Sequence, residues 1–158
     1  MSDNDKQLRD HLLSLLDGGN AHITFDDFVK DFPADKCGEH VDGLPYTAWQ
    51  VLEHMRIAQW DILEFTRDPN HVSPKWPEGY WPPQNETGNA DVWKDSVAKF
   101  HKDLKEMQDL IADPATDLLA KIPHGSGQTV LREALLLADH NSYHLGVLLA
   151  ISRLLTAK

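Results

Sequence analysis

Apolar residues recur every three or four positions in four long stretches of this chain, and this pattern constrains its fold more than any other feature. The stretches cover about 4–17, 45–67, 90–113 and 129–156, and no comparable length alternates apolar and polar residues as a half-buried strand does. Gly18-Gly19 ends the first stretch, and Pro114 ends the third. The pattern predicts an all-α protein whose default architecture is a four-helix bundle.

Local signals add detail to this helical pattern. Thr24 can cap a short helix that reaches about Phe32. A weaker pattern predicts another short helical piece over 115–121. The second long helix is expected to begin near Pro45, because proline is favoured in a first turn, where its missing N–H would have had no partner.

The segment between the second and third long helices is rich in proline, with Pro69, Pro74, Pro77, Pro82 and Pro83. Prolines at this density exclude a helix. A helix of about 23 residues is roughly 35 Å long. Because about twenty extended residues span up to ~66–72 Å, this segment can travel the length of the bundle. It therefore predicts a crossover that sets the second and third long helices parallel.

The same segment also carries Trp76, Tyr80 and Trp81. Loops on a rigid scaffold often carry binding residues, so these aromatic side chains could form a lid over a site. We favour the simpler alternative, in which they anchor the crossover to the surface of the bundle.

Composition limits the kinds of partner. The chain has 158 residues, a length typical of one domain, and we assign residues 1–158 to a single bundle domain. Its 15 Lys and Arg against 25 Asp and Glu leave a net charge of -10, which disfavours nucleic acid and anionic lipid. The first ten residues contain no apolar signal core, and no apolar run approaches the ~20 residues of a membrane span. We therefore expect a cytoplasmic protein whose partner is a small-molecule substrate.

Three of the nine histidines form a pattern. His140 and His144 are four residues apart on the last helix, so they share its apolar face. His54 lies on the apolar face of the second long helix, near its midpoint. If these helices are neighbours, three imidazoles meet in one layer and can hold a divalent ion, with a coordination position left open as in catalytic sites. The alternative is a set of hydrogen-bonded core histidines without metal.

The remaining histidines have no partner at ligand spacing, and we assign them no role: His11, His22, His40, His71, His101 and His124. Cys37 is the only cysteine and is expected to be an unactivated thiol in a loop. A zincin site is excluded because HEXXH requires Glu where this chain has Asn141.

Two carboxylates and a phenol lie near the three histidines in helical register. Asp61 follows His54 by seven residues, on the same face and about 10 Å along the axis, and is our candidate catalytic residue. It could bind substrate or orient an imidazole, or it could instead pair with a basic neighbour. Glu133 could act in the same way, but we favour a role in which its charge stabilises the start of its helix. Tyr143 could donate to an anion bound to the metal, but we favour a helix–helix contact.

The segments 53–62 (EHMRIAQWDI) and 140–146 (HNSYHLG) resemble the DinB/YfiT-like superfamily of metal-dependent enzymes, and the resemblance covers nearly the whole chain. It implies a bundle with a crossover between the second and third helices, a frequent homodimer, and Zn²⁺ or Ni²⁺ on His54, His140 and His144. Fe²⁺ and Mn²⁺ remain alternatives, since imidazole suits several ions. Some members are thiol S-transferases or isomerases that use bacillithiol or mycothiol.

Our leading functional hypothesis is a metal-dependent hydrolase or low-molecular-weight-thiol transferase that activates water or a thiol. The alternative is a non-catalytic metal-binding or stress-response bundle that acts through partners.

Overall fold

The computed structural model describes residues 2–157, which form five α-helices and two short 3-10 turns. The helices are α1 (Asp3–Asp17), α2 (Phe25–Asp31), α3 (Ala48–Arg67), α4 (Ala90–Ala112) and α5 (Val130–Thr156), and the 3-10 turns are η1 (Ala34–Lys36) and η2 (Glu78–Tyr80). No strand forms among these residues, so the predicted all-α class is confirmed. The predicted domain spans residues 1–158, and its two end residues lie outside the described range.

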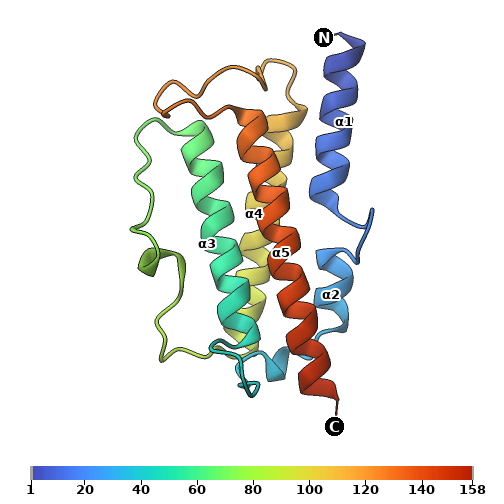
Figure 1. Cartoon of the computed structure of the whole chain (residues 1–158), viewed down its shortest axis with the longest axis vertical. Helices are drawn as coiled ribbons and strands as arrows, with labels where there is room; N and C mark the ends of the chain where they lie inside the picture. Colours follow the sequence, from blue (N-terminus) through green and yellow to red (C-terminus); the bar gives the residue numbers. More distant parts are fainter. Residues whose placement is uncertain (1, 158) are drawn as a thin grey trace.

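The predicted crossover is also present. α3 and α4 run in the same direction, while α1 and α5 run in the opposite one (Figure 1). The connection between α3 and α4, residues 68–89, returns along the outside of the bundle (Figure 1). We call it the crossover segment. α3 packs against both α4 and α5, and α1 packs against α4 and α5 on their other side.

None of the helices within residues 2–157 is long and apolar enough to cross a membrane.

Side-chain caps set where the helices begin. Thr24 caps α2 as predicted, since its hydroxyl accepts a hydrogen bond from the Asp27 backbone N–H at 2.9 Å. α3 begins shortly after the start predicted near Pro45, and Pro45 lies before the helix and not in its first turn. Thr47 and Gln50 form a capping box, each side chain bonded to the backbone N–H of the other, so that α3 begins at Ala48.

The helical piece predicted over 115–121 is absent, and residues 113–121 form turns instead. The Asp113 side chain accepts from the Ala115 N–H at 2.8 Å, and the Asp117 side chain accepts from the Leu119 N–H at 3.0 Å. These bonds offer the backbone an alternative to helical pairing, and the 3.6-residue pattern does not reveal them.

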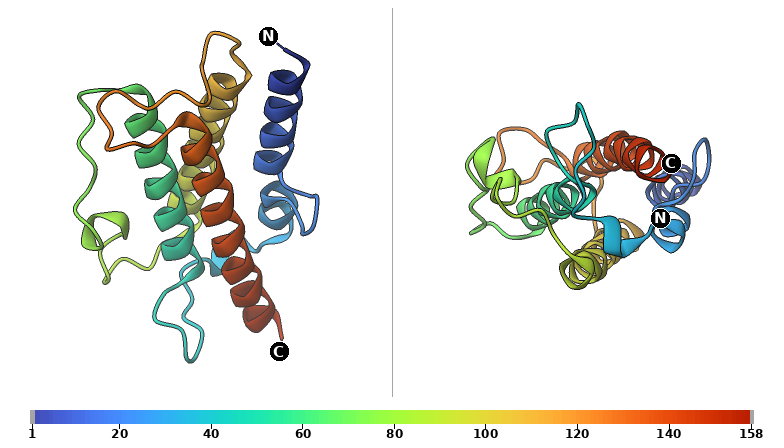
Figure 2. Two further views of the ribbon diagram at one scale, coloured as in Figure 1. Left: turned by 45° about the horizontal axis from the view of Figure 1, so that its top comes forward. Right: turned by 90° about the horizontal axis from the view of Figure 1, so that it is seen from below.

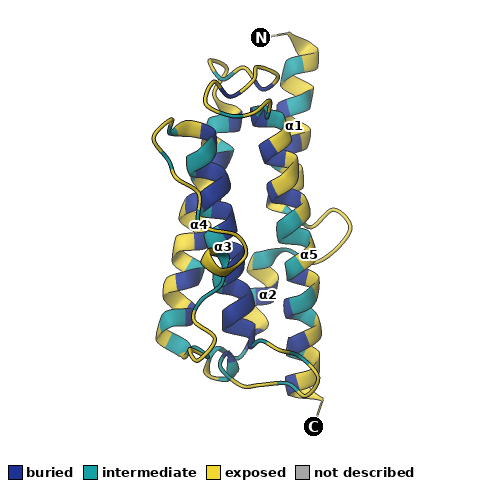
Figure 3. Ribbon diagram, turned by 60° about the vertical axis from the view of Figure 1, so that its left-hand side comes forward, coloured by how far each residue is buried: buried dark blue, intermediate teal, exposed yellow. Residues whose placement is uncertain are grey.

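Two apolar clusters fill the bundle. The first lies around Met55 and Phe100 and receives the aromatic side chains of α2, and the second lies around Leu63 and Ile111. Buried residues extend along the whole of α3 (Figure 3). Gln59 lies between the clusters on α3, is fully buried, and donates from Nε2 to the Phe100 carbonyl oxygen at 2.6 Å.

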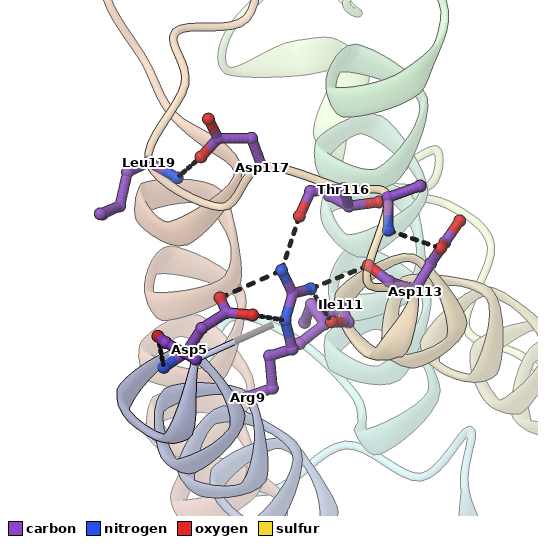
Figure 4. A network of polar contacts seen from close by, with 9 residues as sticks. Asp5, Arg9, Ile111, Asp113, Thr116, Asp117 and Leu119 are labelled. Atoms are coloured by element: carbon purple, nitrogen blue, oxygen red, sulfur yellow. Dashed lines mark hydrogen bonds and ion pairs between the residues drawn. The ribbon is translucent and has the colours of Figure 1, made fainter.

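A buried arginine holds α1 against the end of α4 (Figure 4). The Arg9 guanidinium is paired with the Asp5 carboxylate on its own helix. It also donates to the carbonyl oxygens of Ile111 at 2.6 Å, Asp113 at 2.9 Å and Thr116 at 2.7 Å. The last carbonyl groups of a helix have no partner within it, so Arg9 satisfies acceptors that burial would otherwise leave unpaired.

Replacing Arg9 with Met should therefore lower the free energy of unfolding by about 2–4 kcal/mol, because it leaves three acceptors and the Asp5 carboxylate without their donor. Urea denaturation measures the change. The control is Lys6→Ala, which removes an exposed ion pair with Asp10 from the same helix and should have little effect. Equal effects of the two substitutions would contradict the role assigned to Arg9.

Candidate metal centre

The three predicted histidines meet in one cluster between α3 and α5. The Nε2 atom of His54 lies 3.1 Å from Nε2 of His144 and 3.1 Å from Nε2 of His140. One potential ligand atom from each ring lies within 4.8 Å of the other two. His54 comes from the buried face of α3, and the other two come from successive turns of α5. We call this set the three-histidine cluster.

The spacing of the nitrogens matches that of metal ligands. Two nitrogens that bind one zinc ion at about 2.0–2.1 Å in tetrahedral geometry are separated by about 3.3 Å. The two Nε2–Nε2 distances to His54 are close to this value. The residues present therefore fit a divalent ion bound by three imidazoles.

The crossover segment orients His54. Its Nδ1 lies 2.8 Å from the backbone carbonyl oxygen of Tyr80, which can only accept a hydrogen bond. Nδ1 therefore carries the proton, and in the neutral ring Nε2 keeps its lone pair toward the other two histidines. The indole of Trp81 stacks on the His54 ring, with centroids 4.1 Å apart and planes inclined by 3°. The predicted anchoring role of the loop aromatic side chains thus extends to the cluster itself.

Hydrogen bonding alone does not satisfy the cluster. Both His140 Nε2 and His144 Nε2 approach the single lone pair of His54 Nε2, which cannot accept two hydrogen bonds well. The Nδ1 atoms of His140 and His144 are buried without a partner among the described residues. An ion bound by the three Nε2 atoms would let their three lone pairs converge, which hydrogen bonding cannot do, although it would not pair the two Nδ1 atoms.

Burial keeps the cluster uncharged. It lowers the pKa of His54, despite the opposing hydrogen bond to the Tyr80 carbonyl. Burial, and secondarily the neighbouring His54, lowers the pKa of His140 to about 4. Burial followed by the two neighbouring imidazoles lowers the pKa of His144 to about 3. All three rings are therefore neutral near pH 7, which is the form that binds metals.

Asp61 lies in a second polar group beside the cluster. Its Oδ1 accepts from His71 Nε2 at 2.7 Å, and its Oδ2 accepts from the Tyr80 hydroxyl at 2.6 Å. Burial, aided by Asp61, raises the pKa of Tyr80 to about 12, so the phenol keeps its proton and remains a donor. Tyr80 thus contacts His54 through its backbone and Asp61 through its side chain.

Sequence reasoning did not identify this group as a unit. It assigned His71 no role, because no spacing along the chain links a residue of an irregular loop to α3. Pairing of Asp61 with a basic neighbour was one of the two interpretations considered, and His71 is that neighbour.

An open cavity of about 200 Å³ borders Asp61, and its lining includes none of the three clustered histidines. Its wall includes Asp61, two turns beyond His54, and Leu136, one turn before His140. Ser73, Arg132 and Glu133 also line it. Glu133 lies in the first turn of α5 as expected, but it is only 2% exposed and accepts from Arg132 at 2.8 Å. The cavity therefore borders the Asp61 group and not the imidazoles themselves.

The other singled-out residues lie away from the cluster or at its edge. Trp76 is 70% exposed on the crossover segment. Tyr143 is 69% exposed with its ring edge-on to His144, so the predicted helix–helix contact is wrong for the described chain. Cys37 is fully buried, and burial raises its pKa to about 11, which keeps it an unreactive thiol as expected.

The fold and the cluster together define a helical bundle with a parallel crossover and a three-histidine centre. The family model of the DinB superfamily matches residues 21–148, and the chain belongs to this superfamily. The matched range includes all three histidines. Searches of curated proteins and of solved structures found no match.

The lowered pKa values predict a pH-dependent stability of the metal-free protein. The unfolded chain takes up protons at histidine near the ordinary pKa of 6.5, whereas folded His140 and His144 resist protonation until about pH 4 and 3. The unfolded state therefore binds more protons in this window, and stability should fall as the pH decreases from about 6.5 toward 4. Urea unfolding with a chelator present measures this.

Two variants distinguish the contribution of the three-histidine cluster to this pH dependence from the contributions of other titrating groups. His144→Asn removes one of the resisting imidazoles and should flatten the dependence, whereas His11→Asn, at an exposed position, should leave it unchanged. The same pH dependence in His144→Asn as in the unsubstituted protein would contradict the assignment.

Proposed function

We propose that this protein is a metal-dependent enzyme in which His54, His140 and His144 hold a divalent ion that activates water or a low-molecular-weight thiol. The observation that carries the proposal is the convergence of three neutral imidazoles, one of them oriented by the Tyr80 carbonyl. Three protein ligands are typical of catalytic sites, which keep a position for water or substrate. A fully ligated structural site would need a fourth protein donor.

The bound ion would supply a Lewis acid that stabilises hydroxide over water and thiolate over thiol. Zn²⁺ and Ni²⁺ are our first candidates, followed by Fe²⁺ and Mn²⁺, since neutral imidazole binds all of them. The protein's own contribution is to hold the three rings in place. Trp81 covers one face of His54, and the Tyr80 carbonyl prevents this ring from turning.

We propose that the cavity bordered by Asp61 holds the part of the substrate that extends away from the ion. Its polar wall combines the Asp61 and Glu133 carboxylates with the Arg132 guanidinium, and Leu136 adds apolar surface. His71 and Tyr80 fix the Asp61 carboxylate, one on each oxygen. We propose that Asp61 accepts a proton from the activated nucleophile or positions the substrate that this nucleophile attacks. Both a hydrolytic reaction and thiol transfer use these elements.

A non-catalytic metal-binding bundle is the second candidate, favoured by the burial of His54 under Trp81. His54 is only 3% exposed, so the centre is closed on that side. His140 and His144 are only partly buried, so the centre is less enclosed on the side of α5. The catalytic proposal requires a substrate to reach the ion from that side, whereas a sealed site would exclude it.

The first test measures metal content by inductively coupled plasma mass spectrometry on the untagged protein loaded with Zn²⁺ or Ni²⁺ and then desalted. We expect close to one ion per chain. His140→Ala should lose it, because two imidazoles remain where three are needed. His11→Ala, which removes an exposed histidine outside the cluster, should retain it. Equal metal content in all three proteins would overturn the site assignment.

The same metal-loaded preparations distinguish the proposal of an enzyme from that of a non-catalytic metal-binding bundle. Asp61→Asn should keep the ion, since Asp61 is not one of the three clustered ligands. In a screen of ester and amide hydrolysis and of thiol transfer, the loaded protein should turn over a substrate and Asp61→Asn should be slower by about 10²-fold or more. Full metal content with no turnover in any reaction would favour the non-catalytic bundle.

A further inference from the structure

The crossover segment is attached to α3 at two points close to the candidate metal centre. Both views in Figure 2 place this segment beside α3, on the side away from α1. Within it, the 3-10 turn η2 packs against α3 and ends at Tyr80. The Tyr80 carbonyl accepts from His54, and the Tyr80 hydroxyl donates to Asp61. These two α3 residues are seven positions apart, so the two attachments are separated by about 10 Å along the helix axis.

Two attachments through one residue restrict how Tyr80 can move. Its backbone N–H donates to the Pro77 carbonyl at 3.1 Å, which fixes the residue within η2. Its own carbonyl lies at the end of this turn and accepts from His54 Nδ1 at 2.8 Å. A shift of Tyr80 along α3 would lengthen this bond and the bond to Asp61 together. The bond between the phenol and Asp61 therefore helps to hold the carbonyl against His54.

The carboxylate that holds the phenol is itself fixed. His71 Nε2 donates to Asp61 Oδ1 at 2.7 Å, and the two side chains are only 8% and 11% exposed. This bond leaves Asp61 Oδ2 to the Tyr80 hydroxyl, which lies 2.6 Å away. The His71 ring packs edge-on against Trp60 of α3, with centroids 5.0 Å apart. Because hydrogen bonds to a carboxylate are roughly twice as strong as those between neutral groups, the position of the phenol is well defined.

This chain of side chains reaches the cluster only through His54. Asp61, His71 and Tyr80 are not among the three clustered ligands. The Tyr80 carbonyl holds the proton of His54 on Nδ1, so that Nε2 faces the histidines of α5. Outer partners of this kind fix the orientation of a ligating histidine, and losing one costs about 10–100-fold in metal affinity. Trp81 follows Tyr80 directly and stacks on the same ring, so a shift of the Tyr80 backbone would disturb both contacts of His54.

We propose, on the basis of the metal site proposed above, that Tyr80 is a positioning residue whose phenol, held by Asp61 and His71, sets the affinity of the centre for its ion. Loss of the phenol hydroxyl releases the Tyr80 carbonyl, and the His54 ring then loses its fixed tautomer. The affinity of the centre is thus determined partly by the crossover segment, outside the two helices that carry the ligands.

The test measures the affinity for Zn²⁺ by competition with a chromophoric chelator. Tyr80→Phe removes the hydroxyl and keeps the ring, and we expect it to bind zinc about tenfold more weakly. His71→Leu should also weaken zinc binding, and His71→Gln, which keeps an N–H donor for Asp61, should have a smaller effect. The matched control is Tyr46→Phe, which removes a hydroxyl from a ring that stacks on Trp81 with centroids 5.3 Å apart, and it should leave zinc affinity unchanged.

A second readout distinguishes positioning of His54 from a general loss of stability. In the metal-free protein, long-range ¹⁵N–¹H NMR spectra of the histidine rings should show the His54 proton on Nδ1. In Tyr80→Phe, part of the population should carry the proton on Nε2 instead. Urea denaturation of both proteins measures the free energy of unfolding. A Tyr80→Phe protein that is less stable but keeps both its zinc affinity and the Nδ1–H form would overturn the inference.

Substitutions of Asp61 test whether the phenol acts through this carboxylate. Asp61→Asn keeps a carbonyl oxygen that can accept from the phenol, so it should bind zinc more tightly than Asp61→Ala. Asp61→Ala combined with Tyr80→Phe should lose little more affinity than either substitution alone, because both remove the same hydrogen bond. Additive losses would overturn the role of this bond.

The outcome for the unsubstituted protein separates this inference from the proposed function. Equal zinc affinity in the unsubstituted protein, Tyr80→Phe and His71→Leu would overturn the positioning role and leave the proposed metal site intact. No zinc binding to the unsubstituted protein would overturn both.

Discussion

The hydrogen bond from His54 Nδ1 to the Tyr80 carbonyl connects the topology of this protein to its chemistry. It ties the middle of the crossover segment to α3, and it decides which nitrogen of His54 faces α5. Trp81 stacks on the same ring and Tyr80 reaches Asp61, so two adjacent loop residues organise both polar groups of the candidate site. The parallel arrangement of α3 and α4 makes this possible, because it requires a connection that passes along the outside of α3.

α5 serves two different spaces with residues of the same turns. His140 and His144 point to α3 and the candidate metal centre, whereas Asn141 and Leu145 line a cavity toward α1 and α2. The amide of Gln59 links the two sides, since it bonds Asn141 on α5 and the Phe100 carbonyl on α4. α5 borders two separate spaces because α3 and α1 pack against it from different sides.

The elements that could be predicted from sequence are those set by regular spacing. The four-residue separation of His140 and His144, and the apolar face that carries His54, depend on helical geometry alone, and the three rings do meet. The crossover followed from proline density and chain length. What could not be predicted depends on irregular backbone. The capping box at Thr47 displaced the start expected near Pro45, and aspartate turns replaced the helix expected over 115–121. His71 and Tyr80 reach Asp61 through a loop that no periodicity describes.

X-ray absorption spectroscopy at the zinc edge of the Zn²⁺-loaded protein tests the central claim most directly. The account predicts a first shell of three nitrogen scatterers at about 2.0–2.1 Å with the outer-shell pattern of imidazole, completed by oxygen from solvent. His140→Ala, loaded and desalted in the same way, should retain no zinc with this shell, because two imidazoles remain where three are needed. A shell dominated by carboxylate oxygen or by sulfur, or one that is unchanged in His140→Ala, would contradict a metal centre on His54, His140 and His144.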